Sequence, residues 1–298
     1  MICNLVLAAE DVVGESIVWD SGRKRLVWVD IIGRRIHGLD PITGAHQIWP
    51  VAGRPTSIGL CSDGKAILGF ERHICIWDWQ GPPVPLVEVE PEQPGNRLNE
   101  GVVGPDGAYW VGTMQNNIND DDSPRDISSA TGAIHRYTVD GGLRRVCNDQ
   151  FGITNTFAFP STREIITADT LANKIYRYEI NAEGQLGARR ELSSGFPRGL
   201  PDGSCLDAQG RLWTARVCGG ACLTCISPDG QVEGVVELPC TWPTSCTFGG
   251  PDLATLYVTS ARFTMSREHL AAHPKEGGVF AVKPGVQGRP GHLFGAQA

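Results

Sequence analysis

A pattern that recurs six times constrains the fold of this 298-residue chain more than any other sequence feature. Each copy contains a short apolar strand, a turn, a second strand that ends near Trp, Tyr or a small residue, and a third strand. Counted between the turn residues, the period is about 43 to 55 residues, which is the range of propeller blades. The turn residues are Asp20, Asp63, Asp106, Ser161, Asp207 and Gly250.

The strands within each copy alternate apolar and polar residues, as in "RLVWVD" and "KIYRYEI". A single small sheet cannot bury both of its faces, so the copies must pack face to face. We therefore predict an all-β, six-bladed β-propeller that forms one domain over residues 1–298. The surplus N-terminal strand near "CNLVLAA" is expected to complete the last blade. A stack of β-sandwiches is the alternative.

Two segments interrupt the repeat. Residues 266–277 predict a short helical turn, with Ser266 as its cap and Glu268 in its first turn. Residues 115–131 contain three consecutive aspartates, from Asp120 to Asp122, which resemble part of a calcium loop. The glycine and the terminal glutamate of such a loop are absent, so we expect a solvated loop at the mouth of the channel.

Composition limits the classes of partner. The formal net charge of −7 argues against nucleic acid or an anionic membrane, which both favour clustered Lys and Arg. The N-terminus lacks the pattern of a signal peptide, and no stretch approaches 18 consecutive apolar residues. Ten cysteines without a secretion signal indicate a reducing compartment. We predict a cytoplasmic protein with no nucleic-acid or membrane partner.

The segment "RVCGGACLTC" has a C-x3-C-x2-C spacing that can hold an iron–sulfur cluster. In the fifth copy, however, "CGGAC" is predicted as the hairpin between two strands. Cys222 and Cys225 would then point to opposite faces of one strand, so we predict no iron–sulfur cluster. We expect structural thiols, with a Cys218–Cys222 disulfide under oxidation as the alternative.

Polar residues occupy the same register in the first strand of each copy, five to seven positions before the turn residue. Asn or Asp before an apolar strand is ordinarily a turn former. Two carboxylates and two amides at one register would instead meet at the channel mouth, where repulsion between the carboxylates requires a cation. Oxygen ligands suit Ca, Mg, Mn, Zn or Fe(II), and Arg97 would add a fixed positive charge. The residues at this register are Glu15, Thr56 or Ser57, Asn99, Asn155, Asp202 and Thr244.

At these positions the chain resembles the gluconolactonase/regucalcin family of the senescence-marker-protein type. "GESIVWD" is similar to the G-E-x-x-x-W opening of that family, and "RLNEGVVGPDGAYWVGTM" resembles R-x-N-D-G…D-G-x-x-W-x-G-T-M. "NTFAF…ADT" resembles N-G-x-A-x…A-D-T, and "LPDGSCLDAQGRLWTA" is similar to P-D-G-x-x-x-D-x-x-G-x-x-W-x-A. Departures are Glu100 in place of Asp, Thr156 in place of Gly, and "PSTRE" in place of an S-P-D-G turn.

The resemblance implies a six-bladed propeller that hydrolyses a sugar lactone to the aldonic acid with one divalent metal ion in the central channel. It implies metal-ligand roles for Glu15, Asn155 and Asp202, with Asp202 also the catalytic base. It implies substrate contacts for Arg97, Asn99 and Asn117.

Two other functions are compatible with the sequence. One is a metal-dependent esterase or phosphotriesterase on the same fold. The other is a non-catalytic propeller that binds calcium as a regulator or serves as an interaction platform.

Overall fold

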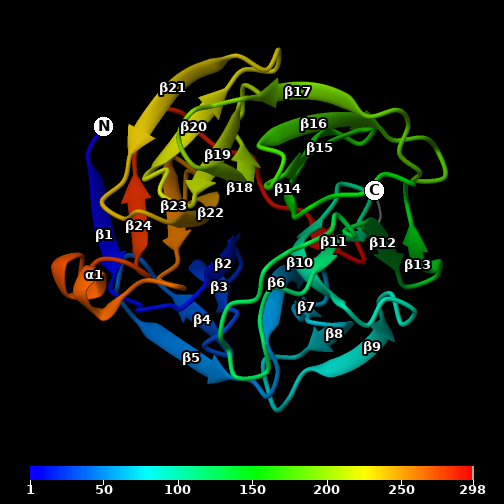
Figure 1. The fold of residues 1–298 in the computed structure, drawn as a ribbon, viewed down its shortest axis with the longest axis horizontal. Helices are drawn as coiled ribbons and strands as arrows, with labels where there is room; N and C mark the ends of the chain where they lie inside the picture. The colour runs from blue at the N-terminus through cyan, green and yellow to red at the C-terminus, as the bar shows by residue number, and fades with distance from the viewer. Residues whose placement is uncertain (297–298) are drawn as a thin grey trace. The chain divides into compact units, whose positions relative to one another are not determined.

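The computed structural model describes residues 1–296. These residues form two compact units, and each unit contains three β-sheets. The first unit comprises Met1–Pro50 and Gly195–Gly291, and the second comprises Val51–Ser194 and the C-terminal segment from His292. Figure 1 shows the strands of each sheet side by side.

The first unit holds three four-stranded antiparallel sheets. One has the order β2 (Gly14–Asp20), β3 (Arg25–Asp30), β4 (Arg35–Leu39) and β5 (His46–Pro50). The next has the order β18 (Leu200–Leu206), β19 (Leu212–Val217), β20 (Cys222–Ile226) and β21 (Val232–Glu237). The third has the order β22 (Pro243–Gly249), β23 (Thr255–Ser260), β24 (Val279–Val282) and β1 (Cys3–Leu7).

The second unit holds the other three sheets. One has the order β10 (Asn96–Val103), β11 (Tyr109–Gln115), β12 (Ile134–Thr138) and β13 (Gly142–Arg145). Another has the order β14 (Thr154–Ser161), β15 (Glu164–Asp169), β16 (Lys174–Glu179) and β17 (Arg190–Ser194). The last contains β6 (Pro55–Cys61), β7 (Ala66–Phe70), β8 (His73–Trp77) and β9 (Val84–Glu88), with β25 (Leu293–Phe294) parallel to β6.

The sheets are the blades of a six-bladed β-propeller, so the fold class predicted from the repeat is confirmed. Five blades are built from four consecutive strands in chain order. The sixth is completed by β1, which pairs antiparallel with β24 as predicted for the surplus N-terminal strand. The stack of β-sandwiches is therefore wrong.

The apolar core lies between neighbouring blades within each unit, because each small sheet must cover its faces with another sheet. In the first unit, Trp213 and Leu223 of the β18–β21 blade pack with Phe248 and Phe280 of the next blade. The second unit follows the same rule. There, side chains such as Trp110 and Ile134 of the β10–β13 blade pack with Phe157 and Tyr178 of the β14–β17 blade.

The predicted turn residues fix the hairpin between the first two strands of a blade. Asp207 is the clearest example, because its Oδ1 accepts hydrogen bonds from the backbone N–H of Gln209 (3.0 Å) and of Arg211 (2.9 Å). Its Oδ2 accepts from Trp213 Nε1 at 3.0 Å. One buried carboxylate thus shapes the turn and anchors a core tryptophan.

The first strand of every blade contains at least one more residue than the partner segment of the second strand, and β14 contains two more. In β2, Glu15 pairs with Val29 and Val18 pairs with Val27, so three steps along β2 match two along β3. This is a β-bulge, which bends the strand and re-aims the side chains at that point. Equivalent register shifts follow Pro55, Leu98, Asn155, Pro201 and Pro243.

The helical turn predicted in the second interruption is confirmed. Helix α1 spans Arg267–Ala272, with Ser266 at its N-cap and Glu268 in its first turn. Ser266 Oγ accepts the backbone N–H of His269 at 3.1 Å. No helix among residues 1–296 is long and apolar enough to cross a membrane.

The cysteine-rich hairpin also has the predicted form. Residues 218–221 connect β19 to β20, and the backbone at Cys218, Gly219 and Ala221 has positive φ angles of 59°, 82° and 51°. Cys222 and Cys225 are buried and lie three positions apart on β20, where side chains alternate between faces. Cys218 and Cys222 are free thiols.

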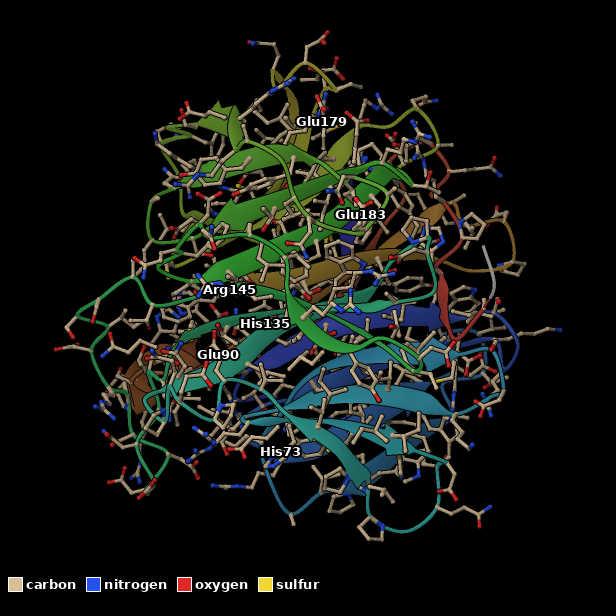
Figure 2. All side chains as sticks on the ribbon, turned by 90° about the vertical axis from the view of Figure 1, so that its right-hand side faces the viewer. His73, Glu90, His135, Arg145, Glu179 and Glu183 are labelled. Carbon is tan, nitrogen blue, oxygen red and sulfur yellow. The ribbon has the colours of Figure 1, made fainter. Side chains whose placement is uncertain are left out.

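The β10–β13 blade buries an imidazole beside a carboxylate (Figure 2). His135 on β12 is 5% exposed, and its Nε2 lies 3.7 Å from Glu90 Oε1, which is too far for a hydrogen bond. Burial, and then the nearby guanidinium of Arg145, lower the pKa of His135 to about 4, while Glu92 opposes the shift. His135 is therefore neutral in the folded protein near pH 7.

We predict that replacing His135 reduces the loss of unfolding free energy that occurs when the pH is lowered. The unfolded chain binds a proton near pH 6.5 and the folded chain near pH 4, so this group's contribution is full above 6.5 and is lost as pH falls towards 4. Relative to His135→Gln, the wild type should lose on the order of 3 kcal/mol of unfolding free energy across that window. Urea unfolding at pH 7 and pH 4.5 measures the difference, with His73→Gln as control for the substitution itself. Parallel wild-type and His135→Gln profiles would refute the prediction.

Candidate functional site

Five of the six predicted site residues lie on the first strand of a blade, beside its bulge. Glu15 and Asn155 are the last paired residues before the bulge in β2 and β14. Asn99 and Asp202 are the first bulged residues in β10 and β18. Asn117 instead follows β11, in the 115–131 insertion.

In the second unit, Arg97 links the insertion to the first strand of its blade. The Arg97 side chain is 5% exposed, and its Nε and Nη2 donate to Asn117 Oδ1 at 3.1 and 2.8 Å. Its Nη1 donates to Asn99 Oδ1 at 2.9 Å and to the carbonyl of Leu98 at 2.8 Å. Three predicted substrate-contacting residues are thus joined through one guanidinium.

Asn99 continues this chain of hydrogen bonds to the neighbouring blade. Its Nδ2 donates to Asn155 Oδ1 at 3.0 Å and to the carbonyl of Thr154 at 2.9 Å. Both donors of the amide are engaged and its oxygen already accepts from Arg97, so one acceptor position of Asn99 is left for a ligand. Asn99 therefore couples Arg97 to Asn155.

The amide of Asn155 is held by hydrogen bonds at both its nitrogen and its oxygen. Its Nδ2 donates to Thr170 Oγ1 at 2.8 Å, which fixes the opposite side of the amide as the oxygen side. The side chain is 4% exposed, and Oδ1 accepts from Asn99, which leaves one lone pair for another partner. The position fits a hard cation such as Ca²⁺ or Mg²⁺.

A second polar cluster fixes the start of the strand that carries Arg97 and Asn99. Asn96 Nδ2 donates to Glu90 Oε2 at 2.8 Å and to the carbonyl of Thr131 at 3.1 Å. Thr131 Oγ1 returns a hydrogen bond to Asn96 Oδ1 at 2.6 Å. Because Thr131 ends the insertion, this cluster ties β10 and the insertion together.

In the first unit, β22 lies against the segments that carry Glu15 and Asp202. Thr244 Oγ1 donates to the carbonyl of Gly14, the residue before Glu15. A Cβ at Gly203, the residue after Asp202, would lie 2.8 Å from Ser245 Cα, so only glycine permits this approach. Asp202 is 5% exposed, and one carboxylate oxygen of the half-buried Glu15 accepts the backbone N–H of Ser16 at 3.1 Å.

The metal-ligand set of Glu15, Asn155 and Asp202 stays a prediction, since its members belong to different units. Residues 1–296 contain no group of three or more His, Cys, Asp or Glu side chains able to hold a metal ion. The predicted ligand set does not belong to this class of group, because one of its three members, Asn155, is an amide.

Glu100 is a buried carboxylate. From the sequence it is notable only because it replaces the Asp of the family motif. It is 7% exposed, and its Oε1 accepts the backbone N–H of Gly101 at 3.0 Å. Burial raises its pKa to about 7. The charge of Glu100 acts on Tyr109, whose hydroxyl group shares a hydrogen bond of 2.7 Å with that of Ser57. Ser57 and Tyr109 are 52 residues apart, so no single motif contains both. Ser57 does belong to the predicted register of polar residues.

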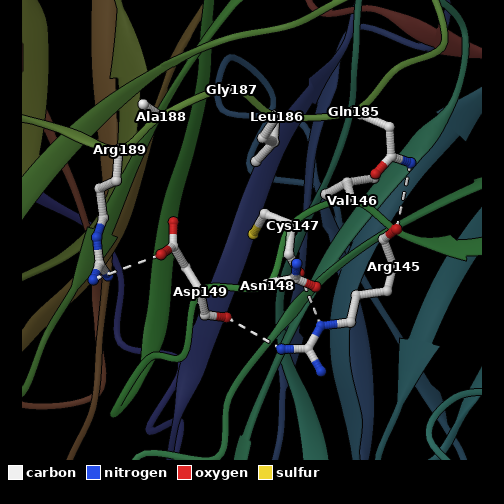
Figure 3. A pocket seen from close by; sticks show the side chains of 10 residues that line it. All are labelled: Arg145, Val146, Cys147, Asn148, Asp149, Gln185, Leu186, Gly187, Ala188 and Arg189. Atoms are coloured by element: carbon white, nitrogen blue, oxygen red, sulfur yellow. Dashed lines mark hydrogen bonds and ion pairs between the residues drawn. The ribbon is translucent and has the colours of Figure 1, made fainter.

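A pocket of about 390 Å³ lies elsewhere in the second unit and contains none of the predicted site residues. Figure 3 shows Arg145 and Asp149 in its wall, where Arg145 Nε donates to the carbonyl of Cys147 at 2.9 Å. Arg189 Nη2 lies 3.8 Å from Asp149 Oδ1. Burial raises the pKa of the Cys147 thiol, which opposes a nucleophilic role.

Comparison with known proteins assigns the family. The family model described as SMP-30/gluconolactonase/LRE-like region matches residues 13–262. The chain belongs to this family. The resemblance drawn from the four motifs is thereby confirmed, and it places Glu15, Arg97, Asn155 and Asp202 within the matched region of an SMP-30/gluconolactonase/LRE-like protein.

Relatives span nearly the whole chain. A 6-deoxy-6-sulfogluconolactonase of Pseudomonas putida is 35% identical over 97% of this chain and 97% of that protein. The regucalcin of Gallus gallus is 31% identical over 94% of both. The crystal structure of a calcium-binding protein, regucalcin, from Agrobacterium tumefaciens superposes with a TM-score of 0.87 at 26% identity, covering 98% of this chain and 97% of the other.

We predict that Glu100 destabilises the folded protein above neutral pH. Its pKa is about 7 when folded and near 4.5 when unfolded, so its contribution is full below pH 4.5 and is lost as pH rises through 7. The variant Glu100→Gln should gain on the order of 3 kcal/mol of unfolding free energy relative to the wild type between pH 4.5 and 8.5. Denaturant unfolding at these pH values measures it, and an unchanged difference between the two proteins would contradict the assignment.

Proposed function

We propose that the chain hydrolyses a sugar lactone to the corresponding aldonic acid, with one divalent cation held by Glu15, Asn155 and Asp202. The observation that supports this most directly is the chain of hydrogen bonds from Asn117 through Arg97 and Asn99 to Asn155. It joins the predicted substrate contacts to a predicted ligand with fixed geometry. The name of the 6-deoxy-6-sulfogluconolactonase relative supports the hydrolysis of a sugar lactone.

The donor set fits a cation of the calcium, magnesium or manganese type, and zinc or iron(II) are compatible as well. When bound, such an ion polarises the lactone carbonyl and lowers the pKa of water, which supplies the electrophilic part of the chemistry. Asn155 would contribute an amide oxygen already oriented by Thr170. Glu15 and Asp202 would contribute the negative charge.

The remaining work falls to side chains of the protein. Asp202, a buried carboxylate on the bulge of β18, would take a proton from the attacking water and return one to the ring oxygen as it leaves. Arg97 and Asn117 would hold the sugar hydroxyls so that the ester faces that water. Because Arg97 is held by two amides and a carbonyl, it is pre-organised for this contact.

The name of one relative indicates the class of lactone to test. The Pseudomonas putida protein is named for a 6-deoxy-6-sulfo sugar lactone, so we propose an aldonolactone, five- or six-membered, with or without an anionic group at C6. The assay panel should contain the sulfonated lactone, glucono- and pentono-lactones, and an aryl ester. Hydrolysis of the aryl ester alone would favour an esterase.

Calcium binding without catalysis is the second candidate, and the regucalcin relatives favour it. Calorimetric titration with Ca²⁺, run beside the lactone assay, separates the two. Tight binding of Ca²⁺ with no turnover under any divalent metal would favour the binding protein.

We predict that Asp202→Asn lowers kcat/KM for the best lactone by about 100-fold or more, because the variant loses both a general base and a ligand charge. Asp229→Asn, an exposed aspartate in a turn of the same blade, is the matched control and should keep wild-type activity. A pH-stat assay measures turnover, with spontaneous ring opening subtracted. Chelation followed by dialysis should abolish turnover, and a divalent metal should restore it. Unchanged turnover in Asp202→Asn would remove the mechanism.

A further inference from the structure

The 115–131 insertion contains a small hairpin, residues 117–125, which we call the insertion hairpin. Ile118 and Pro124 form an isolated antiparallel bridge. The backbone N–H of Arg125 donates to the carbonyl of Asn117 at 2.8 Å, and that of Asp122 donates to the carbonyl of Asn119 at 3.0 Å. Asn117 therefore lies at the base of the hairpin, and Asp122 lies at its tip.

A buried arginine from the neighbouring blade grips the tip. Arg54, directly before β6, is 6% exposed. Its Nε and Nη2 donate to Asp122 Oδ1 at 2.9 and 2.6 Å, and Nη2 also donates to the carbonyl of Asn119 at 2.8 Å. Its Nη1 donates to Glu71 Oε1 at 2.5 Å. The guanidinium is thus clamped between a carboxylate of its own blade and the hairpin tip.

The base of the hairpin is held by the second arginine, Arg97, through the two hydrogen bonds to Asn117 Oδ1. Contacts inside the hairpin fix only its internal shape. Asn119 Nδ2, for example, donates to Ser123 Oγ at 3.0 Å and to the carbonyl of Pro124 at 3.2 Å. The link from Arg54 is of another kind, because it ties the tip to the β6–β9 blade.

Backbone strain at the tip is consistent with a clamp. Asp122 has a φ of 66°, a left-handed conformation that aspartate tolerates better than most residues but that still raises the energy of the chain. Such a conformation persists where surrounding contacts hold it. Charge-assisted hydrogen bonds to a largely buried guanidinium are contacts of sufficient strength.

We infer that Arg54 is a positioning residue for the candidate site: by holding Asp122, it keeps the insertion hairpin in place and so keeps Asn117 against Arg97. Its effect on turnover rests on the proposed function, whereas its effect on the hairpin does not. Arg54 touches neither a predicted ligand nor a predicted substrate contact, so it acts indirectly. One route is the hairpin, and the other is Glu71, whose carbonyl accepts the backbone N–H of Leu98 at 2.8 Å. Asp122→Asn changes the hairpin route and leaves the Glu71 contact in place.

The test compares Asp122→Asn with Asp120→Asn. The first removes the charge that Arg54 grips while keeping a residue that tolerates positive φ. The second makes the same change at an exposed aspartate two residues away, which makes no side-chain hydrogen bond among the described residues. Arg54→Gln and Arg54→Lys complete the set. Thermal melts show which variants are folded. If one variant is unfolded, the remaining variants still test the inference.

The first readout is hydrogen exchange of the peptide that spans residues 117–125. Asp122→Asn and Arg54→Gln should exchange about 10-fold faster or more than the wild type, and Asp120→Asn should match the wild type. Arg54→Lys, which keeps the charge but not the fork of donors, should fall between. The double variant Arg54→Gln/Asp122→Asn should exchange no faster than Arg54→Gln, since Arg54→Gln already removes the contact with Asp122.

The second readout is the split between KM and kcat on the best lactone. Loss of the clamp should raise KM about 5- to 10-fold and leave kcat within about twofold, because substrate positioning is weakened and the chemical groups are intact. Equal hydrogen exchange and equal KM in Asp122→Asn and Asp120→Asn would overturn the inference. A wild type without lactone turnover would defeat the proposed function, while hydrogen exchange would still decide whether the clamp exists.

Discussion

A β-bulge in the first strand of every blade is the constraint on which the candidate site depends. In a regular strand, neighbouring side chains alternate between faces, and both faces of these blades are needed for the core. The bulge breaks that alternation at one point. Asn155 directly precedes the bulge of β14, and Asp202 lies within that of β18, where a bulge re-aims side chains. The same irregularity recurs in all six blades, so the polar register is a consequence of the backbone before it is a feature of any one residue.

Much of this architecture could be predicted from the sequence because the same pattern of strands and turns recurs in every blade. Runs of apolar residues mark the buried second strands, as in β3 and β15, and the turn aspartates mark the hairpins. The fourth strands escaped notice because they are largely exposed and carry mixed residues, as in "HQIWP" of β5 and "RELSS" of β17. The two-residue strand β25 has too little sequence to give a signal. Register and the family resemblance predict the candidate site residues. The hydrogen bonds from Asn117 to Asn155 join three separate segments, and no spacing along one segment predicts them.

The departure at Thr156 has a structural meaning that the sequence alone could not supply. Its φ is 56°, in the left-handed region where glycine is favoured and a β-branched residue is strained by about 1–2 kcal/mol. Ser16, which follows Glu15, has a φ of 53°. Two predicted ligands thus precede residues in the same unusual conformation, one in each unit. The strain lies beside the ligand positions, and in Thr156 it is held by complete burial of the side chain.

The three aspartates of the insertion show why charge clusters need their partners before a role is assigned. As a calcium loop they would direct several oxygens at one point. Instead, Asp121 Oδ1 accepts from the backbone N–H of Ser123 at 3.0 Å and from its hydroxyl, while Asp122 Oδ1 accepts from Arg54. A cation at this place would meet the positive guanidinium of Arg54, which opposes its binding electrostatically. Asp121 therefore serves the shape of the hairpin, and Asp122 serves its attachment. That is a mechanical role, since it fixes Asn117, the one predicted site residue that no blade strand positions.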